Sequence, residues 1–333
     1  MNISEVAKRA RVSTATVSRT INATGTVRPE TAERVWKVIR TLGYHPNTNA
    51  RALVSGRTNL LGLIISDITN PFFPDFVKSF EEMALKHGLD VIVGNTSYDP
   101  GRMSHCVRRM LERKVDGVAI FTSEIGRGLI AQLEERRLPI VFLDTGTVRE
   151  RISNIKVNYE MGIHEAIEHL FHLGHKRIGF ISGPMELRSA QIRRAAFLKW
   201  LGHHGLLVDE GLIESGNHKI DGGESAMRRL LALANKPTAV LASNDLTAIG
   251  ALRAIYSAGL RVPDDISVIG YDDIDFSQYT QPALTTVRLS RVELAEKALD
   301  ALVSVLGEKN KMGRVFTVET HLVVRDSTGK SKE

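Results

Sequence analysis

Residues 3–22 read ISEVAKRARVSTATVSRTIN and determine what the amino-terminal part of the chain can form. Asn2 and Glu5 are spaced as a capping box, and the apolar residues that follow them repeat at helical spacing. After a tight turn, Ser13 is placed to act as the N-cap of a second helix over residues 14–21. The pattern predicts two short helices joined by a turn, which is typical of a helix-turn-helix unit.

The second helix has an outer face that suits the major groove of DNA. Val17 and Ile21 would be buried, which leaves small or polar side chains and one arginine, Arg19, on the outside. A helix with so little bulk can enter the groove and place Arg19 on a guanine edge. A helical bundle that docks another protein is the alternative. The residues predicted to face DNA are Thr14, Ala15, Thr16, Ser18 and Arg19.

A third helix is predicted between Pro29 and Gly43, because proline favours the first helical position and glycine favours the residue after the last. Its apolar residues repeat at helical spacing, and Trp36 is the only large aromatic among them. Three helices of this size make a core that can barely fold alone. We expect Trp36 to supply the largest side chain of that core.

The charge of the chain is concentrated at its amino-terminal end. Residues 1–58 carry ten Lys and Arg against three acids, a net charge of +7, and the other 275 residues carry 34 against 35, a net charge of −1. One basic end on a neutral body indicates a polyanionic partner, and nucleic acid is the first candidate.

Several classes of protein are excluded by composition. The longest apolar runs are strand-sized, so we expect no membrane span, and the charged start lacks the apolar segment of a signal peptide. Cys106 is the only cysteine, which excludes an internal disulfide and a multi-cysteine zinc site. We expect a cytoplasmic protein that has no metal and no cofactor.

These motifs resemble the headpiece of the lactose/galactose repressor family of bacterial transcription regulators. The likeness continues through LGYHPN at residues 42–47 and ARAL at residues 50–53. By that resemblance Thr14, Ala15 and Arg19 read bases, and Leu53 wedges into the minor groove. It also implies DNA contacts by Asn22, Asn47 and Arg51.

The linker at residues 46–58 is too short and too polar to hold a helix unaided, so we expect it to become ordered on DNA. A plain flexible tether is the alternative. The head departs from the family pattern at two positions. Arg11 stands in the turn, where a left-handed backbone costs about 1 kcal/mol, and Arg28 replaces the usual serine cap of the third helix.

From residue 60 onward, short apolar runs alternate with amphipathic helical patterns in two series of about five units. This alternation predicts an α/β body of two doubly wound parallel-sheet lobes with a cleft between them. The resemblance implies a body similar to periplasmic sugar-binding proteins. The expected domains are a headpiece at 1–45, a hinge at 46–58 and a body at 59–333, with lobe one at about 59–160 plus 290–325 and lobe two at about 161–289.

Ligands of open parallel sheets bind beyond the carboxyl ends of the strands, and polar or aromatic residues stand at these positions here. Any one of them could instead be a helix cap or a core residue. By the resemblance Phe72, Phe73, Asp144, Arg193, Asn244 and Asp272 contact an effector, and Glu124, Ser189 and His218 stand where the family varies with its ligand. Leu289 replaces a common glutamine and Ala196 a common glycine, which predicts a less polar wall.

Two enzyme classes are weighed against this interpretation. Residues 126–131, GRGLIA, fit the dinucleotide-binding pattern with Asp144 18 residues further on, but the preceding strand is expected to end near Thr122, too early for the phosphate turn. Asp272 and Asp273 could be the paired acids of a sugar-modifying hydrolase, yet no nucleophile or metal cluster accompanies them. We therefore expect a regulator rather than an enzyme.

The sequence thus predicts a homodimeric DNA-binding repressor whose affinity for a pseudo-palindromic operator is set by a small ligand in the cleft. A sugar or sugar derivative is the first candidate for that ligand, and a nucleoside or purine is the alternative. No carboxy-terminal leucine heptad is present to indicate a tetramer.

Overall fold

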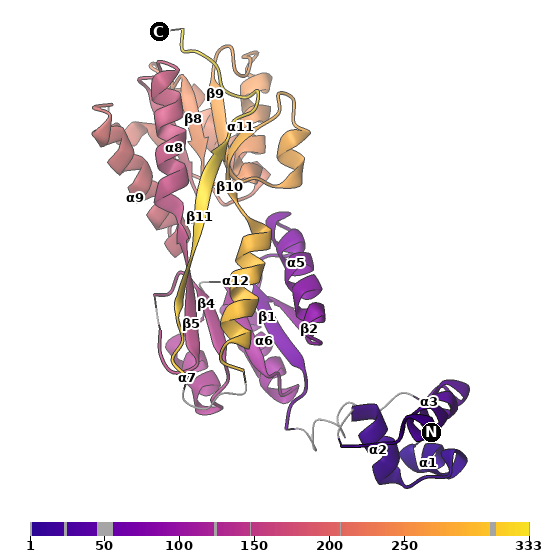
Figure 1. The fold of residues 1–333 in the computed structure, drawn as a ribbon. Helices are drawn as coiled ribbons and strands as arrows, with labels where there is room; N and C mark the ends of the chain where they lie inside the picture. Colours follow the sequence, from indigo (N-terminus) through magenta and orange to yellow (C-terminus); the bar gives the residue numbers. More distant parts are fainter. Residues whose placement is uncertain are drawn as a thin grey trace. The chain divides into compact units, whose positions relative to one another are not determined.

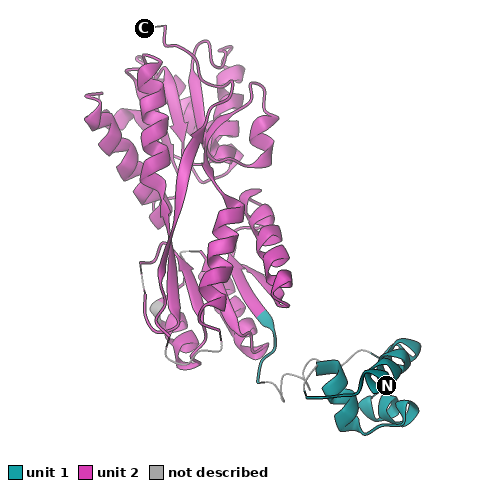
Figure 2. Cartoon of the chain, viewed as in Figure 1, with its two compact units in different colours: residues 1–60 teal, residues 61–333 magenta. Residues whose placement is uncertain are grey.

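The computed structural model describes residues 2–22, 25–44, 56–122, 125–146, 148–206, 208–306 and 311–332. The chain divides into two compact units, residues 1–60 and residues 61–333, shown in separate colours in Figure 2. The predicted hinge contacts Asn47, Arg51 and Leu53 lie outside the described residues, and so does Glu124. The finer domain limits given above stay predictions.

Unit 1 contains the three predicted helices, α1 (Ile3–Ala10), α2 (Thr14–Asn22) and α3 (Pro29–Leu42). The backbone N–H of Thr16 donates to Ser13 Oγ at 3.1 Å, so the predicted cap of α2 is confirmed. Asn2 Oδ1 likewise accepts from the N–H of Glu5 at 3.1 Å. The carboxylate of Glu5 pairs with Arg9, at 3.1 Å, so only the Asn2 half of the predicted capping box forms.

The core of unit 1 is aliphatic, and the expectation for Trp36 is wrong. Its side chain is 39% exposed, because it lies on the side of α3 that faces away from α1 and α2. Tyr44 is the aromatic residue that packs on this core instead. Arg11 adopts the left-handed backbone that the turn requires, with φ of 53°, and Arg28 provides no side-chain cap. The buried residues are Val6, Ala7, Ala10, Val17, Val35 and Ile39.

Unit 2 has the predicted two-lobe α/β architecture (Figure 1). Lobe one contains β1 (Leu60–Ile65), β2 (Asp90–Asn95), β3 (Gly117–Phe121), β4 (Ile140–Leu143) and β5 (Ile152–Asn158), with helices α5 (Phe72–Lys86), α6 (Pro100–Glu112), α7 (Arg127–Glu135) and α12 (Arg291–Val303). Lobe two contains β6 (Ile178–Ser182), β7 (Ile213–Ser215), β8 (Ala239–Ala242), β9 (Ser267–Asp272) and β10 (Thr285–Leu289), with helices α8 (Tyr159–His172), α9 (Arg188–His203), α10 (Ile220–Leu231) and α11 (Asp245–Ser257) and the 3-10 turns η1 (Glu210–Leu212) and η2 (Asp275–Gln278).

The two sheets are joined by a strand that the sequence patterns do not predict, β11 (Val315–Val323). Its first half pairs in parallel with β5, and its second half pairs antiparallel with β10. The hydrogen-bonded order is therefore β2-β1-β3-β4-β5-β11-β10-β9-β8-β6-β7. The expected two parallel-sheet lobes are confirmed, and the antiparallel pair of β10 with β11 is an addition to them. Most of β11 is exposed or half-buried, so it lacks the apolar run that marks the other strands.

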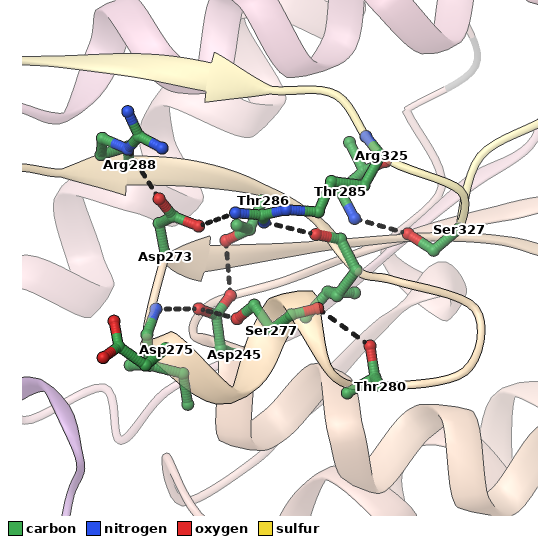
Figure 3. A network of polar contacts seen from close by, with 12 residues as sticks. Asp245, Asp273, Asp275, Ser277, Thr280, Thr285, Thr286, Arg288, Arg325 and Ser327 are labelled. Carbon is green, nitrogen blue, oxygen red and sulfur yellow. Dashed lines mark hydrogen bonds and ion pairs between the residues drawn. The ribbon is translucent and has the colours of Figure 1, made fainter.

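A polar network fixes the part of lobe two next to the crossing (Figure 3). Asp273 accepts from Arg288 at 2.6 Å and from Arg325 at 2.7 Å, which ties the end of β9 to β10 and to the segment after β11. Asp245, at the start of α11, accepts from the N–H of Ile274 at 2.8 Å and also from the hydroxyls of Ser277 and Thr286. These bonds hold the loop after β9 in one conformation.

Asp245 is fully buried. A Cβ on Gly270 would lie only 2.2 Å from its carboxylate, so this position of β9 requires glycine. Burial raises the pKa of Asp245 from 3.8 to about 7, and the nearby Asp272 carboxylate adds to the rise. The folded chain therefore keeps a proton on Asp245 over a pH range in which the unfolded chain has lost it.

Ionisation of Asp245 should lower the free energy of unfolding as pH rises from about 4 to about 7, because the folded pKa of this carboxyl lies above its unfolded value. His218, whose folded pKa is lowered to about 3, contributes the opposite slope below about pH 6.5, so the effect of Asp245 is read from the difference between wild type and variant. Asp245→Asn should remove about 2 kcal/mol of that fall, since asparagine cannot ionise. Denaturant unfolding at a series of pH values measures it. Asp264→Asn, at an exposed carboxylate, is the control and should keep the wild-type slope. An unchanged slope in Asp245→Asn would show that Asp245 is ionised throughout.

Candidate ligand-binding site and DNA-binding helix

A cavity of about 380 Å³ lies in unit 2 and is lined by residues of both lobes, a size that suits a small ring compound. Every described residue that the sequence assigned to an effector lines it. The sequence analysis identified the correct edge of both sheets, although contact with a ligand stays a prediction. These residues are Phe72, Phe73, Asp144, Ser189, Arg193, His218, Asn244 and Asp272.

The cavity residues stand where strands end, as the rule for parallel sheets requires. Asp144 follows β4, Asn244 follows β8 by two residues, and Asp272 is the last residue of β9. Asp144, His218 and Asp272 have φ of 54°, 60° and 111°, a positive-φ backbone that few residues other than glycine adopt, although Asp and His adopt it more often than most. Strained backbone of this kind persists only where the surroundings over-determine it, and it gathers at functional sites.

Arg193 carries a buried positive charge at the side of the cavity. Its side chain comes from α9, and the residue is only 6% exposed. The guanidinium carbon lies 4.0 Å from the ring centre of Tyr271 and 5.0 Å from that of Tyr159, in cation–π geometry. One terminal nitrogen donates to the carbonyl of Ser243, and the other lies 3.7 Å from Asp272. Burial raises the pKa of Asp272 to about 6, against the lowering effect of Arg193.

Asp144 and Asn244 use their polar atoms within the protein. Asp144 accepts from the N–H of Val157 at 2.9 Å and from the hydroxyl of Tyr159 at 2.6 Å. Asn244 accepts from the N–H of Thr247 at 2.9 Å, which caps α11, and donates to the carbonyl of His218 at 3.0 Å. Both residues therefore shape the cavity as caps and braces, whatever bonds they add to a ligand.

Three buried side-chain atoms that line the cavity have no hydrogen-bond partner among the residues that the structure describes: Thr122 Oγ1, Arg193 Nε and His218 Nε2. Burial lowers the pKa of His218 to about 3, so its imidazole is neutral. A Cβ on Gly183 would lie 1.8 Å from His218 Nε2, so glycine at the end of β6 makes room for this ring. Unpaired buried polar atoms are costly, and a bound ligand would satisfy them.

The rest of the lining is largely aromatic and apolar. Phe72 and Phe73 lie with ring centres 5.5 Å apart at 88°, and Leu289 contributes the apolar wall that the sequence predicts. Ser66, Thr122 and Thr145 also line the cavity and could have been found, because each directly follows a strand of lobe one or comes two residues after it. Tyr159 directly follows β5, and Phe121 and Leu143 end β3 and β4, so the same rule reaches them. The remaining lining residues do not stand at a strand end: Asn70, Tyr98, Glu186, Leu187 and Arg188.

Helix α2 of unit 1 presents the surface that DNA reading requires. Thr14, Ala15 and Arg19 are exposed, so nothing in unit 1 covers the three predicted base-reading positions. Thr16 and Ser18 are half-buried, and each is braced by a neighbour: Thr16 by Ser13 at 2.9 Å, and Ser18 by Asn22 at 3.2 Å. Those two side chains are oriented before any DNA is present.

Neither enzyme alternative gains support from the geometry. Gly126 comes five residues after the last residue of β3, so it does not form the tight strand-to-helix turn of a dinucleotide site. Asp273 is held by two arginines and is not free to act as an acid. Among the described residues, no group of three or more His, Cys, Asp or Glu side chains could hold a metal ion. No helix in the described part of the chain is long and apolar enough to cross a bilayer.

Comparison with known proteins agrees with these observations. Residues 2–47 match the model of bacterial regulatory proteins of the lacI family, and residues 167–328 match a periplasmic binding protein-like domain. The HTH-type transcriptional repressor PurR of Aliivibrio salmonicida is 33% identical over 98% of this chain and 99% of its own length, and that of Erwinia tasmaniensis is 36% identical over 98% and 96%.

Two solved structures are also similar over most of their length. The lac repressor dimer bound to operator and the anti-inducer ONPF has a TM-score of 0.87 at 29% identity, covering 99% of each chain. The complex of the transcriptional regulator CelR with cellobiose has a TM-score of 0.70 at 29% identity, covering 98% of this chain and 99% of that one. The chain belongs to the lacI family of bacterial regulatory proteins.

Proposed function

We propose that this protein is a transcriptional repressor that reads an operator with α2 and responds to a small ligand in the cavity of unit 2. Two features of the same chain carry the proposal. The outer face of α2 is exposed and has mostly small side chains, and the cavity of unit 2 contains buried polar atoms without hydrogen-bond partners. Ligand coupling in such proteins typically changes DNA affinity about 5–150-fold. The protein would act in the cytoplasm, where bacterial DNA lies, and would return its ligand chemically unchanged.

A purine base or nucleoside is the ligand class that we favour. The aromatic pair Phe72 and Phe73 and the apolar Leu289 suit the flat faces of a heterocycle. The neutral imidazole of His218 and the guanidinium of Arg193 suit the nitrogen and oxygen atoms at its edge. Repressors that match over 98% of this chain carry the name PurR. A sugar is the second candidate, because the similar CelR structure holds cellobiose.

We further propose that two copies form a dimer through an apolar face of lobe two, the groove face. Phe276 is 60% exposed and Tyr279 is 78% exposed, and both line a groove formed mainly by α10 and α11 of lobe two, with Thr69 and Pro71 of lobe one also lining it. A cluster of exposed apolar side chains on one face indicates a partner surface. A second copy is the occupant we choose, because two heads related by a two-fold axis read a pseudo-palindrome and the similar lac repressor is a dimer.

A thermal-shift screen of purine bases, nucleosides, monosaccharides and disaccharides tests the ligand class. We expect a purine compound to raise the unfolding midpoint, and the recovered compound to be unaltered. Arg193→Met should weaken its binding by about 10–150-fold, because a charged hydrogen-bond donor is lost from the cavity. Arg194→Met is the matched control, since the next residue on α9 pairs with Glu210 at the surface. Stabilisation by sugars alone would favour the second candidate, and turnover of the ligand would overturn the proposal.

Arg19→Ala tests the DNA-binding helix. It should cost about 1–3 kcal/mol in operator affinity and relax the preference at one base position. Selection of bound sequences from random duplex DNA measures the preference, and fluorescence anisotropy measures the affinity. Lys37→Ala removes one exposed charge from α3 and should leave the base preference unchanged. If Arg19→Ala selects the same sequences as the wild type, α2 does not read that base.

Phe276→Lys tests the groove face. Analytical ultracentrifugation should show a dimer for the wild type and a shift to monomer for the variant, because the new charge would be desolvated in the interface. Val208→Lys places the same charge at another exposed apolar residue of lobe two and should remain a dimer. A dimer that survives Phe276→Lys at micromolar concentration would assign the contact to a different face.

A further inference from the structure

Arg291 lies at one of the places where the chain passes between the lobes of unit 2. It is the first residue of α12 and follows the capping residue Ser290, whose hydroxyl accepts from the N–H of Glu293 at 3.2 Å. The strand before it, β10, belongs to lobe two, whereas α12 packs on α5 and on the strands of lobe one (Figure 1). The backbone of Arg291 is thus part of the hinge.

The side chain of Arg291 contacts both lobes at once. Its Nη1 donates to the carbonyl of Asp273 at 2.6 Å, and its Nη2 lies 3.1 Å from the carboxylate of Asp275, both in lobe two. Its Nε lies 3.4 Å from the carboxylate of Asp75, in the first turn of α5 in lobe one. We call these three contacts the Arg291 bridge. All three nitrogens of one guanidinium are used, and the side chain is only 17% exposed.

The partners of Arg291 are close neighbours of the cavity residues. Asp75 comes three residues after Phe72 on the same helix, and Asp273 directly follows Asp272. A rotation of one lobe against the other would move the start of α5 relative to the loop after β9. It would therefore change the distances within the Arg291 bridge and the shape of the cavity together.

Arginine is suited to this position because its rigid planar fork can bind three acceptors in fixed directions, which the single ammonium of lysine cannot do. Each exposed ion pair of this kind is worth little by itself. The bond to the Asp273 carbonyl and the burial of the guanidinium strengthen the set, since water competes less for a desolvated donor.

We propose that Arg291 is a positioning residue that stabilises the present arrangement of the two lobes and so sets how far they move when the cavity is occupied. The consequence for repression rests on the function proposed above, whereas the effect on the lobes does not. The test therefore uses neither DNA nor ligand, and a failure of the proposed function would not affect it.

Lobe arrangement can be followed by single-molecule energy transfer between dyes on Lys78→Cys in lobe one and Lys236→Cys in lobe two, both exposed, with Cys106→Ser to remove the native thiol. Labelled chains are diluted into unlabelled protein so that an assembly carries at most one pair. In Arg291→Met we expect the ratio of lobe arrangements to change about 10- to 150-fold, which corresponds to loss of a charged hydrogen bond, with a small addition from the two half-exposed ion pairs.

Arg288→Met is the matched control, because Arg288 also binds Asp273 but both partners belong to lobe two. It should leave the distribution unchanged. Asp75→Asn should give part of the Arg291→Met effect and add nothing in the double variant, and Arg291→Lys should restore part of the wild-type distribution. Unfolding midpoints confirm that each variant is folded.

Raising NaCl from about 0.05 M to about 0.5 M should shift the wild type toward the Arg291→Met distribution and leave that variant unaffected. Identical distributions for the wild type and Arg291→Met would overturn the proposal. An equal shift in Arg288→Met would also overturn it, because the effect would then not depend on a contact between the lobes.

Discussion

A cation buried beside the cavity constrains most of unit 2. Removing the charge of Arg193 from water costs several kcal/mol unless its surroundings compensate, and the structure supplies that compensation from several elements. Tyr159 comes from the start of α8, the Ser243 carbonyl from the residue after β8, and Tyr271 and Asp272 from the end of β9. The residues that follow or end these strands therefore converge on one guanidinium, which forms part of the cavity wall.

Much of this arrangement could be predicted from the sequence, because local rules act through adjacent residues. Ser13 caps α2 by reaching the third residue along, and Asp144 and Asp272 stand at strand ends whatever the rest of the chain does. Polar residues that follow parallel strands are expected at one edge of each sheet. That rule correctly assigned Asp144 and Asp272 to one cavity, although they lie more than a hundred positions apart in the sequence. Where the sequence left a choice between ligand and cap, as at Asn244, the structure shows that the cap is real.

The features that sequence patterns missed depend on contacts between distant segments. β11 has no apolar run because it forms the narrow joint between two sheets, where few of its side chains are covered. Trp36 follows the helical repeat of α3 but falls beyond the edge of a core that small aliphatic residues already fill. Tyr159 directly follows β5 at the place where the chain passes between the lobes, so the rule for strand ends could have assigned it to the cavity.

The three arginines that contact Asp273 differ in whether they also contact lobe one. Arg288 and Arg325 lie 2.6 and 2.7 Å from the Asp273 carboxylate, within lobe two. Arg291 lies 3.1 Å from the Asp275 carboxylate and 3.4 Å from Asp75 across the boundary. A joint that moves needs contacts strong enough to favour one arrangement and weak enough to be exchanged for another. Contacts inside a lobe do not change when the lobes rotate as rigid bodies, so a small ligand that rotates them acts on the contacts between the lobes.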